Sequence, residues 1–397
     1  MQNFYKIAIA VLIGLFVFGL GVGVGHAVTV YFDKDEVIAD NSVNQDFALL
    51  VDVWRLVENQ FYDGVPAGPN TTYGAIRGAL SSLNDPYTIF VEPQPRELER
   101  AELDGQHGGI GAGIYRDEAN QVHLKPLVDS PSERAGILET DILVKVDDVQ
   151  VQPAMSLDEI RAEIIGEVGT EVSLTFSRDG EAEPVIVVIE RQVIETPSVE
   201  WRILEEDQRI GYIKVRLFSN RTNKELQRAV DELSAEGAAA FLVDLRGNGG
   251  GLLDAAVDVA SQFLRDGMVL KEDRRGEDPK IYEVRKGGKL LDQPLAVLVD
   301  AGTASASEIV AGAIQDHQRA PLIGERTYGK GSVQLVYDLP DASSLHVTVA
   351  KWFTPNNSSI DGAGLTPDIE VLFTEEDHAQ GRDPQFARAI EYLQSQP

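Results

Sequence analysis

The sequence predicts a multidomain α/β protein with an N-terminal membrane helix and helical region, an inserted β-barrel and an α/β core. Three observations lead to this prediction. An uncharged apolar run lies near the N-terminus, short strand-like runs between glycine-rich turns follow residue 105, and strands alternate with helices from residue 198 onward. We expect a membrane segment at 1–32, a helical region at 33–104, the barrel at 105–197 and the core at 198–397.

The composition excludes several classes of function. The chain has 397 residues, and 35 basic against 64 acidic side chains give it a formal net charge of −29. So acidic a surface repels phosphate backbones, which argues against a nucleic-acid partner. The absence of cysteine excludes disulfides, thiol catalysis and cysteine metal sites. The six histidines show no metal-ligand spacing, so we expect neither a metal nor another cofactor.

The N-terminal apolar run predicts export of the protein. The run from Ile7 to Ala27 contains no charged residue, and as a helix it would span about 30 Å, the thickness of a bilayer core. Lys6 precedes it and acidic residues follow from Asp33 onward, which favours an anchored, extracytoplasmic protein. The alternative is a cleaved signal peptide and a secreted chain. GxxxG spacings in the same run leave a homo-oligomer open.

The region up to residue 104 is predicted to be helical. Apolar residues from Phe47 to Phe61 fall close to a 3.6-residue period. A turn is expected at Pro66–Asn70 and a second helix at Tyr73–Leu83, which Asn84-Asp85-Pro86 ends. A third, charged helix is expected at Arg96–Leu103.

The next region reads as a compact barrel of about 90 residues, because short strands alternate with turns and only one helix interrupts them. The helix is expected at Ser156–Ile165. The expected strands are Val122–Pro126, Ile142–Val146, Val172–Ser177 and Val185–Ile189.

From residue 198 the alternation of strands and helices predicts a largely parallel sheet, whose ligands bind at the carboxyl ends of the strands. The expected strands are Ile210–Val215, Phe241–Val243, Leu295–Val299 and Leu322–Gly324. The expected helices are Asn223–Ala235, Leu252–Arg265 and Ala306–Asp316.

The run DAGTASASEI (300–309) carries the strongest chemical signal. The strand Leu295–Val299 leads into small residues, and a serine lies where a helix begins. Ser305-Ala306-Ser307-Glu308 also reads as a capping box, so a purely structural N-cap is the competing interpretation. A nucleophile at that place would have backbone N–H groups beside it to hold an oxyanion. The spacing alone does not separate Ser305 from Ser307.

A lysine flanked by glycines follows in YGKGSVQ (328–334). A buried Lys330 with a lowered pKa would be neutral and could accept the proton of a serine. The competing interpretation is a solvated loop lysine. Gln334 lies four residues later on the same strand face, and a bend at Gly331 would be needed to bring the two side chains together. Together the two motifs predict a serine nucleophile with a lysine general base, which cuts acyl bonds.

A glycine run, DLRGNGGG (244–251), follows the strand Phe241–Val243 directly. Its free N–H groups suit an oxyanion hole, and a plain tight connection is the competing interpretation. No Gly-Lys-Ser/Thr follows, so the run is not a phosphate-binding P-loop. Asp316 would lie about 16 Å along the helix from Ser305, which favours a structural role.

Taken together, these motifs resemble the carboxy-terminal processing, or tail-specific, proteases. In TASASEIVAGAIQD and ERTYGKGSVQ the resemblance implies that Ser305 is the nucleophile, Lys330 the general base and Gln334 the residue that orients it. It implies an oxyanion hole formed by Ala306 with Gly250 or Gly251. DPYT (85–88) and AKWFTPNNSSIDGAGLTPDI (350–369) also look like the family, and Asp316 matches an aspartate important in some members.

The region from Gly105 to about residue 196 resembles a PDZ domain. Its HGGIGAGI run would bind the carboxylate of a substrate tail through backbone amides, and a strand edge would pair with the tail. The resemblance implies that the carboxylate-binding residues are Gly109, Ile110, Gly111 and Ala112. Three residues depart from the family pattern, where asparagine, proline and glycine are usual: Asp300, Gly249 and Thr140. Asp300 is expected to change the charge near Lys330.

The sequence thus predicts a membrane-anchored, extracytoplasmic serine endopeptidase that acts on proteins or peptides with free C-termini. A catalytically silent, membrane-anchored PDZ adaptor is the alternative, and the presence of both Ser305 and Lys330 argues against it. A non-proteolytic acyl hydrolase would leave the PDZ-like segment unexplained.

Overall fold

The computed structural model describes residues 45–396 except 66–67, 94–95, 97–98, 101–102, 104–105, 118 and 196. The predicted membrane segment Ile7–Ala27 lies outside these residues, and the predicted helix Arg96–Leu103 lies partly outside them. No helix in the described part of the chain is both long enough and apolar enough to cross a bilayer. The chain divides into two compact units, Met1–Pro69 and Asn70–Pro397.

The described part of the first unit contains α2 (Gln45–Gln60), which confirms the helix expected from the apolar period. Six of its apolar side chains are exposed: Phe47, Leu49, Leu50, Val51, Val53 and Leu56.

The second unit begins with α3 (Asn70–Ser81) and β1 (Ile89–Val91). Tyr73 of α3 and Phe90 of β1 are both buried, and their ring centroids lie 4.9 Å apart. Asn84 takes a positive φ of 53° between the two elements, as expected for the residue that ends a helix before Asp-Pro.

The strands and the helix predicted for the second region are present, but the strands form two separate sheets where one barrel was expected. The main sheet has the order β3-β4-β5-β7-β8, with β6 beside β5, while β2 pairs with β9. The strands are β2 (Gln106–Gly109), β3 (Ala112–Arg116), β4 (Val122–Pro126), β5 (Ile142–Val146), β6 (Val149–Gln150), β7 (Glu171–Ser177), β8 (Val185–Glu190) and β9 (Gln192–Glu195). The helices are α5 (Pro131–Arg134) and α6 (Leu157–Ile164), and a capping box at Ser156 and Glu159 begins α6.

The core contains a six-stranded sheet of order β10-β11-β12-β15-β16-β19. Only β10 and β11 pair antiparallel, so the prediction of a largely parallel sheet is confirmed. The strands are β10 (Val199–Ile203), β11 (Ile210–Val215), β12 (Ala240–Asp244), β15 (Leu295–Val299), β16 (Leu322–Gly324) and β19 (Ile369–Glu370).

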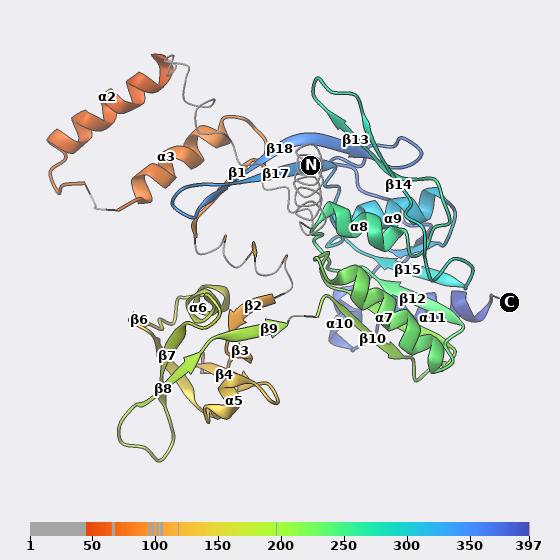
Figure 1. The fold of residues 1–397 in the computed structure, drawn as a ribbon, viewed down its shortest axis with the longest axis horizontal. Helices are drawn as coiled ribbons and strands as arrows, with labels where there is room; N and C mark the ends of the chain where they lie inside the picture. Colours follow the sequence, from red (N-terminus) through yellow and green to blue (C-terminus); the bar gives the residue numbers. More distant parts are fainter. Residues whose placement is uncertain are drawn as a thin grey trace, which may run out of the picture. The chain divides into compact units, whose positions relative to one another are not determined.

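Helices cover both faces of this sheet (Figure 1). Val297 and Val299 of β15 point into the cluster under α7, α8 and α9, whereas Ala296 and Leu298 point toward α11. This alternation is the two-residue period of a strand buried on both faces. The helices are α7 (Thr222–Ala235), α8 (Leu253–Ala260), α9 (Ala306–Asp316), α10 (Glu375–Ala379) and α11 (Pro384–Gln394).

Helix α8 is shorter than the predicted Leu252–Arg265. It ends at Ala260, and the N–H groups of Gln262 and Phe263 bond three residues back, to Val259 and Ala260. The chain therefore tightens into a 3₁₀-like turn where a helical continuation was expected.

A second, antiparallel sheet was missed by the sequence analysis except for the strand that contains Gln334. It contains β1, β13 (Met268–Arg274), β14 (Lys280–Glu283), β17 (Ser332–Asp338) and β18 (Ser344–Phe353). Strand β13 contains Lys271-Glu272-Asp273, a poor strand sequence. Glu272 is nevertheless buried, because it accepts hydrogen bonds from Tyr282 and Arg274 at 2.7 Å and 2.9 Å.

Candidate active site

Ser305 lies in the turn that joins β15 to α9, at the carboxyl edge of the parallel sheet. Its backbone has φ 55° and ψ −116°, a conformation that residues other than glycine rarely adopt. Backbone strain of this kind persists only where the surrounding structure holds it. Here the N–H of Ser305 donates to Oε2 of Glu308 at 2.9 Å.

Lys330 and Gln334 are in contact. The Nζ of Lys330 donates to Oε1 of Gln334 at 2.7 Å. Lys330 lies just before β17, and the pairing of β17 with β18 is irregular between Val333 and Gln334. This register shift lies between Lys330 and Gln334 in the chain, and the two side chains are within hydrogen-bond distance. Gly331 packs so closely on Asp361 that an added Cβ would lie 2.8 Å from the Asp361 side chain.

Burial lowers the pKa of Lys330 below its ordinary value, because an ammonium group loses water there. The carboxylates of Glu99 and Asp85 act in the opposite direction and favour the charged form. Asp300, which was expected to change the charge near Lys330, is not among the groups that shift its pKa. Asp300 Oδ1 instead accepts hydrogen bonds from the N–H groups of Gly247 and Gly302, each at 2.9 Å.

Glu308 connects the segment that contains Ser305 to the segment that contains Lys330. It is fully buried, and Oε2 accepts from the N–H groups of Ser305 and Lys330, each at 2.9 Å. Its Oε1 accepts from the N–H of Gly329 at 2.7 Å and from the hydroxyl of Thr327 at 2.5 Å. One carboxylate therefore fixes both backbone segments, as buried charges require several donors.

The sequence analysis recognised Glu308 only as part of a capping box and missed this second role. The signal was local, since a serine followed three residues later by glutamate is a common helix start. The partners Gly329 and Lys330 come from a loop 21 and 22 residues away, and only the fold brings them there.

The glycine run 247–251 packs directly against the turn that contains Ser305. Gly250 has φ +112°, and a Cβ there would lie 2.9 Å from both Ala304 O and Ser305 Cβ. Its N–H donates to Oδ1 of Asn248 at 2.9 Å. Gly251 has φ +135° and lines the same cavity as Ser305 and Ala306.

Ser307 and Asp316 have structural partners. Ser307 is fully buried, and its hydroxyl donates to the carbonyl of Asn248 at 2.9 Å. Oδ2 of Asp316 accepts from the N–H of Asn356 at 2.7 Å, which agrees with the structural role expected for it.

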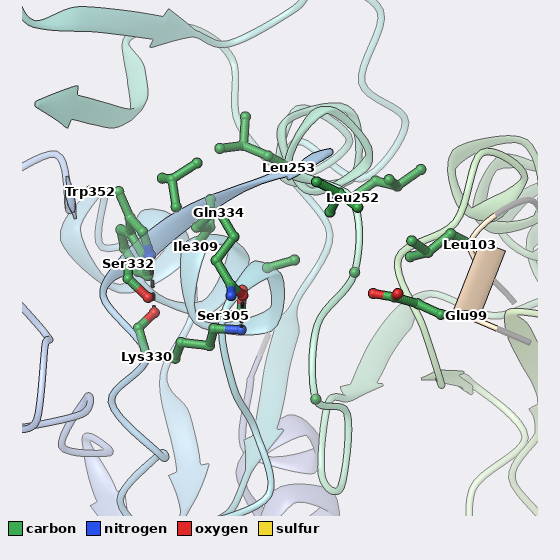
Figure 2. Close-up of a pocket in the computed structure, with 15 residues that line it drawn as sticks. Glu99, Leu103, Leu252, Leu253, Ser305, Ile309, Lys330, Ser332, Gln334 and Trp352 are labelled. Carbon is green, nitrogen blue, oxygen red and sulfur yellow. Dashed lines mark hydrogen bonds between the residues drawn. The ribbon is translucent and has the colours of Figure 1, made fainter. Parts of the chain in front are cut away.

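A cavity of about 280 Å³ contains Ser305 and Lys330 in its wall. Figure 2 shows Ser305, Lys330 and Gln334 together at this wall, with Glu99 and Leu103 on another side. Apolar side chains make up much of the remaining lining: Leu252, Leu253, Ile309, Val333, Val336 and Trp352. The described residues contain no cluster of carboxylates and histidines that could hold a metal.

A second cavity, of about 440 Å³, lies in the region 105–197. Its lining includes the four predicted carboxylate-binding residues Gly109, Ile110, Gly111 and Ala112. Gly111 has φ +67°, and a Cβ there would lie 2.6 Å from Ser130 Cβ. The sequence analysis did not anticipate Arg161 of α6, which lines the same cavity among apolar residues.

Comparison with known proteins identifies the family. Residues 209–371 match the model for peptidase family S41, and residues 126–178 match that for the PDZ domain. A carboxy-terminal-processing protease of Bartonella bacilliformis is 34% identical, over 84% of this chain and 76% of its own. A carboxyl-terminal-processing protease of Synechocystis is 34% identical, over 87% of this chain and 86% of its own.

A solved structure titled photosystem II D1 C-terminal processing protease is 31% identical, covers 83% of this chain and 94% of its own, and has a TM-score of 0.48. The identity to the curated relatives extends over most of both chains. The chain therefore belongs to the carboxy-terminal processing proteases, serine-type peptidases of family S41 that contain a PDZ domain.

Proposed function

We propose that the chain is a serine endopeptidase in which Ser305 is the nucleophile and Lys330 its general base. The observation that carries the proposal is that both side chains line one cavity, while Lys330 is partly buried and bonded to Gln334. A lysine whose pKa is lowered can be neutral, and only a neutral amine can accept the proton of a hydroxyl.

In the proposed reaction, Ser305 Oγ attacks the carbonyl carbon of the scissile peptide bond as its proton passes to Lys330 Nζ. The carbonyl electrons move to oxygen, and the N–H of Ala306 stabilises the oxyanion. Gly251 is favoured over Gly250 as the second donor, because the N–H of Gly250 already donates to Asn248. Lys330 then protonates the leaving amine, and water attacks the acyl-enzyme with Lys330 again as base.

We further propose that the substrates are extracytoplasmic proteins, recognised by their C-terminal tails in the cavity of the PDZ domain. The backbone around Gly109–Ala112 lines that cavity, which supports binding of a terminal carboxylate by amides. Extracytoplasmic placement and attachment to a membrane rest on the apolar run Ile7–Ala27 of the sequence.

The test compares two alanine variants with two matched controls on a protein substrate and with a fluorophosphonate label. Ser305→Ala and Lys330→Ala should lose turnover by at least about a thousandfold, with unchanged thermal melting. Ser307→Ala should still cleave, and so should Lys351→Ala, whose side chain is 61% exposed and pairs with Asp361. Normal cleavage by Ser305→Ala would contradict the proposed mechanism. A wild-type chain that neither cleaves the substrate nor reacts with the label would favour the catalytically silent adaptor.

A further inference from the structure

The amide of Gln334 joins Lys330 to a backbone carbonyl from a distant part of the chain. Its Oε1 accepts from Lys330 Nζ at 2.7 Å, and its Nε2 donates to the carbonyl oxygen of Tyr87. Tyr87 lies 247 positions before Gln334, between α3 and β1.

The Tyr87 carbonyl determines which way the Gln334 amide points. A side-chain amide has an oxygen end and an NH₂ end of nearly equal shape, and its hydrogen-bond partners decide the orientation. A carbonyl can only accept, so the NH₂ end faces Tyr87 and the oxygen end faces Lys330. When Lys330 is neutral, its amine donates one N–H to Gln334 Oε1. This bond limits the directions in which the nitrogen lone pair can point.

The ring of Tyr87 is a second contact with the same lysine. Lys330 Nζ lies 5.0 Å from the centroid of this ring. The ring covers one side of the amine: it keeps water away, which favours the neutral form, and its face attracts the ammonium form. Burial, together with Tyr328, Asp361 and Glu308, raises the pKa of Tyr87 itself to about 12, so its hydroxyl stays neutral.

The segment around Tyr87 is fixed on the same hairpin that contains Gln334. Asp85 accepts from the N–H of Tyr87 at 3.1 Å and from the hydroxyl of Thr88 at 2.6 Å. The N–H of Thr348 in β18 donates to the Thr88 hydroxyl at 3.1 Å. Beyond Thr88, β1 pairs antiparallel with β18, and Ile89 lies opposite His346. The Thr88 hydroxyl thus connects the turn around Tyr87 to β18.

We propose that Tyr87 is a positioning residue of the active site, which orients Lys330 through the Gln334 amide and shields it with its ring. The inference rests on the Ser305–Lys330 chemistry proposed above. It gives the segment 85–91 a role in catalysis: the segment completes the surroundings of the general base, and loosening its attachment to β18 lowers the rate of the chemical step.

The first experiment loosens the segment without touching the cavity. Thr88→Val removes the hydroxyl that bonds Asp85 and Thr348 while keeping the side-chain shape. It should lower kcat by about tenfold with little change in KM, because a small misplacement of a reacting group slows chemistry more than binding. Thr88→Ser should restore most of the loss. Thr374→Val is the matched control. It breaks a similar hydrogen bond, from the Thr374 hydroxyl to the carboxylate of Asp377 in α10, and should leave kcat unchanged.

The second experiment asks whether Tyr87 acts through Gln334 and Lys330. Tyr87→Ala should lower kcat, and Tyr87→Phe should recover most of the rate. In a Gln334→Ala background, Thr88→Val should have little further effect, because the amide that it misplaces is already gone. Tyr87→Ala should also change the surroundings of the Lys330 amine on the side that the ring covers, so the pH at which kcat/KM rises should move. The charges of Asp85 and Glu99 remain in every variant.

The outcomes separate this inference from the mechanism on which it rests. Additive losses in the Gln334→Ala background, or wild-type kcat and pH profile in both Thr88→Val and Tyr87→Ala, would overturn the role of Tyr87. Ser305→Ala is assayed beside them: turnover there would remove the serine–lysine mechanism itself. Thermal melting curves identify variants that are merely unfolded, and Thr88→Val with its Thr88→Ser rescue then decides the question if Tyr87→Ala fails to fold.

Discussion

At the scale of single residues, the site depends on two buried groups, Lys330 and Glu308, for which burial has different consequences. Burial of Lys330 disfavours its charge, which a general base requires. Glu308 is buried as well, but four donors surround its two oxygens. The first group can exchange protons with a substrate, whereas the second joins two backbone segments.

The pH dependence of kcat/KM should report on Lys330. Its pKa is lowered from 10.5, and the neutral form is the active one, so activity should rise with pH through this lowered value and then level off. The measurement is kcat/KM on an ester or peptide substrate at constant ionic strength. A flat profile between about pH 5 and about pH 9 would contradict a lysine base.

Glu308→Gln should damage both stability and turnover. The amide offers one acceptor oxygen in place of two, so its NH₂ group would face N–H groups that now donate to a carboxylate. We expect a loss of about 2–4 kcal/mol in the free energy of unfolding and a fall in kcat of about a hundredfold. Urea unfolding and steady-state assays measure the two effects. Glu236→Gln, at an exposed end of α7, is the control and should change neither.

At the scale of elements, three segments meet at the start of α9. The glycine run is tied to the turn before Ser305 by Asp300 and by the bond from the N–H of Ala304 to the carbonyl of Asn248 at 3.0 Å. The turn is tied to the third segment by the bond from the N–H of Tyr328 to the carbonyl of Thr303, also at 3.0 Å. Each segment follows a strand of the parallel sheet, so the sheet aligns all three.

Two neighbouring glycines should respond differently to alanine. Gly250→Ala places a Cβ 2.9 Å from Ser305 Cβ at a φ of +112°, so the turn or the glycine run must shift. We expect kcat to fall by about a hundredfold, a loss typical of a disturbed oxyanion site. At Gly249 a Cβ meets nothing within 4 Å, and φ is not positive, so Gly249→Ala should retain most activity. Equal rates for the two variants would contradict this account.

At the scale of the whole molecule, the two cavities suggest a division of labour. One contains Ser305 and Lys330 in the α/β core, and the other lies in the PDZ domain. On the function proposed above, the PDZ domain binds the substrate's chain end and the α/β core cuts the peptide bond.

Amidation of a substrate's C-terminus should therefore slow its cleavage. The change removes the terminal charge and leaves the scissile bond intact, so KM should rise if the domain only tethers, and kcat should fall if it also gates the site. The measurement is kcat/KM for paired free-acid and amidated peptides. Gly111→Ala, whose Cβ would lie 2.6 Å from Ser130 Cβ, should make the two peptides equivalent. Equal values in the wild-type enzyme would refute tail recognition.

The sequence by itself determined the family, the peptidase class and most elements of the parallel sheet. Strands such as Leu295–Val299 are continuous apolar runs, and helices such as Ala306–Asp316 begin at a capping signal, so local pattern is sufficient to locate them. The serine and glycine motifs were visible because each follows a strand of that sheet directly, and the lysine motif because it lies just before β17 of the antiparallel sheet.

Only the tertiary structure decided what surrounds these motifs. Strand β13 forms around a buried glutamate that its own sequence disfavours, because Tyr282 and Arg274 satisfy it. Glu308 reaches its loop partners, and the Tyr87 carbonyl reaches Gln334, across separations of 19 to 247 residues. The local sequence pattern does not indicate which distant residues will form hydrogen bonds with each other. Their hydrogen bonds form only when the sheets have packed, because a buried carboxylate or amide takes whichever donors and acceptors the fold places around it.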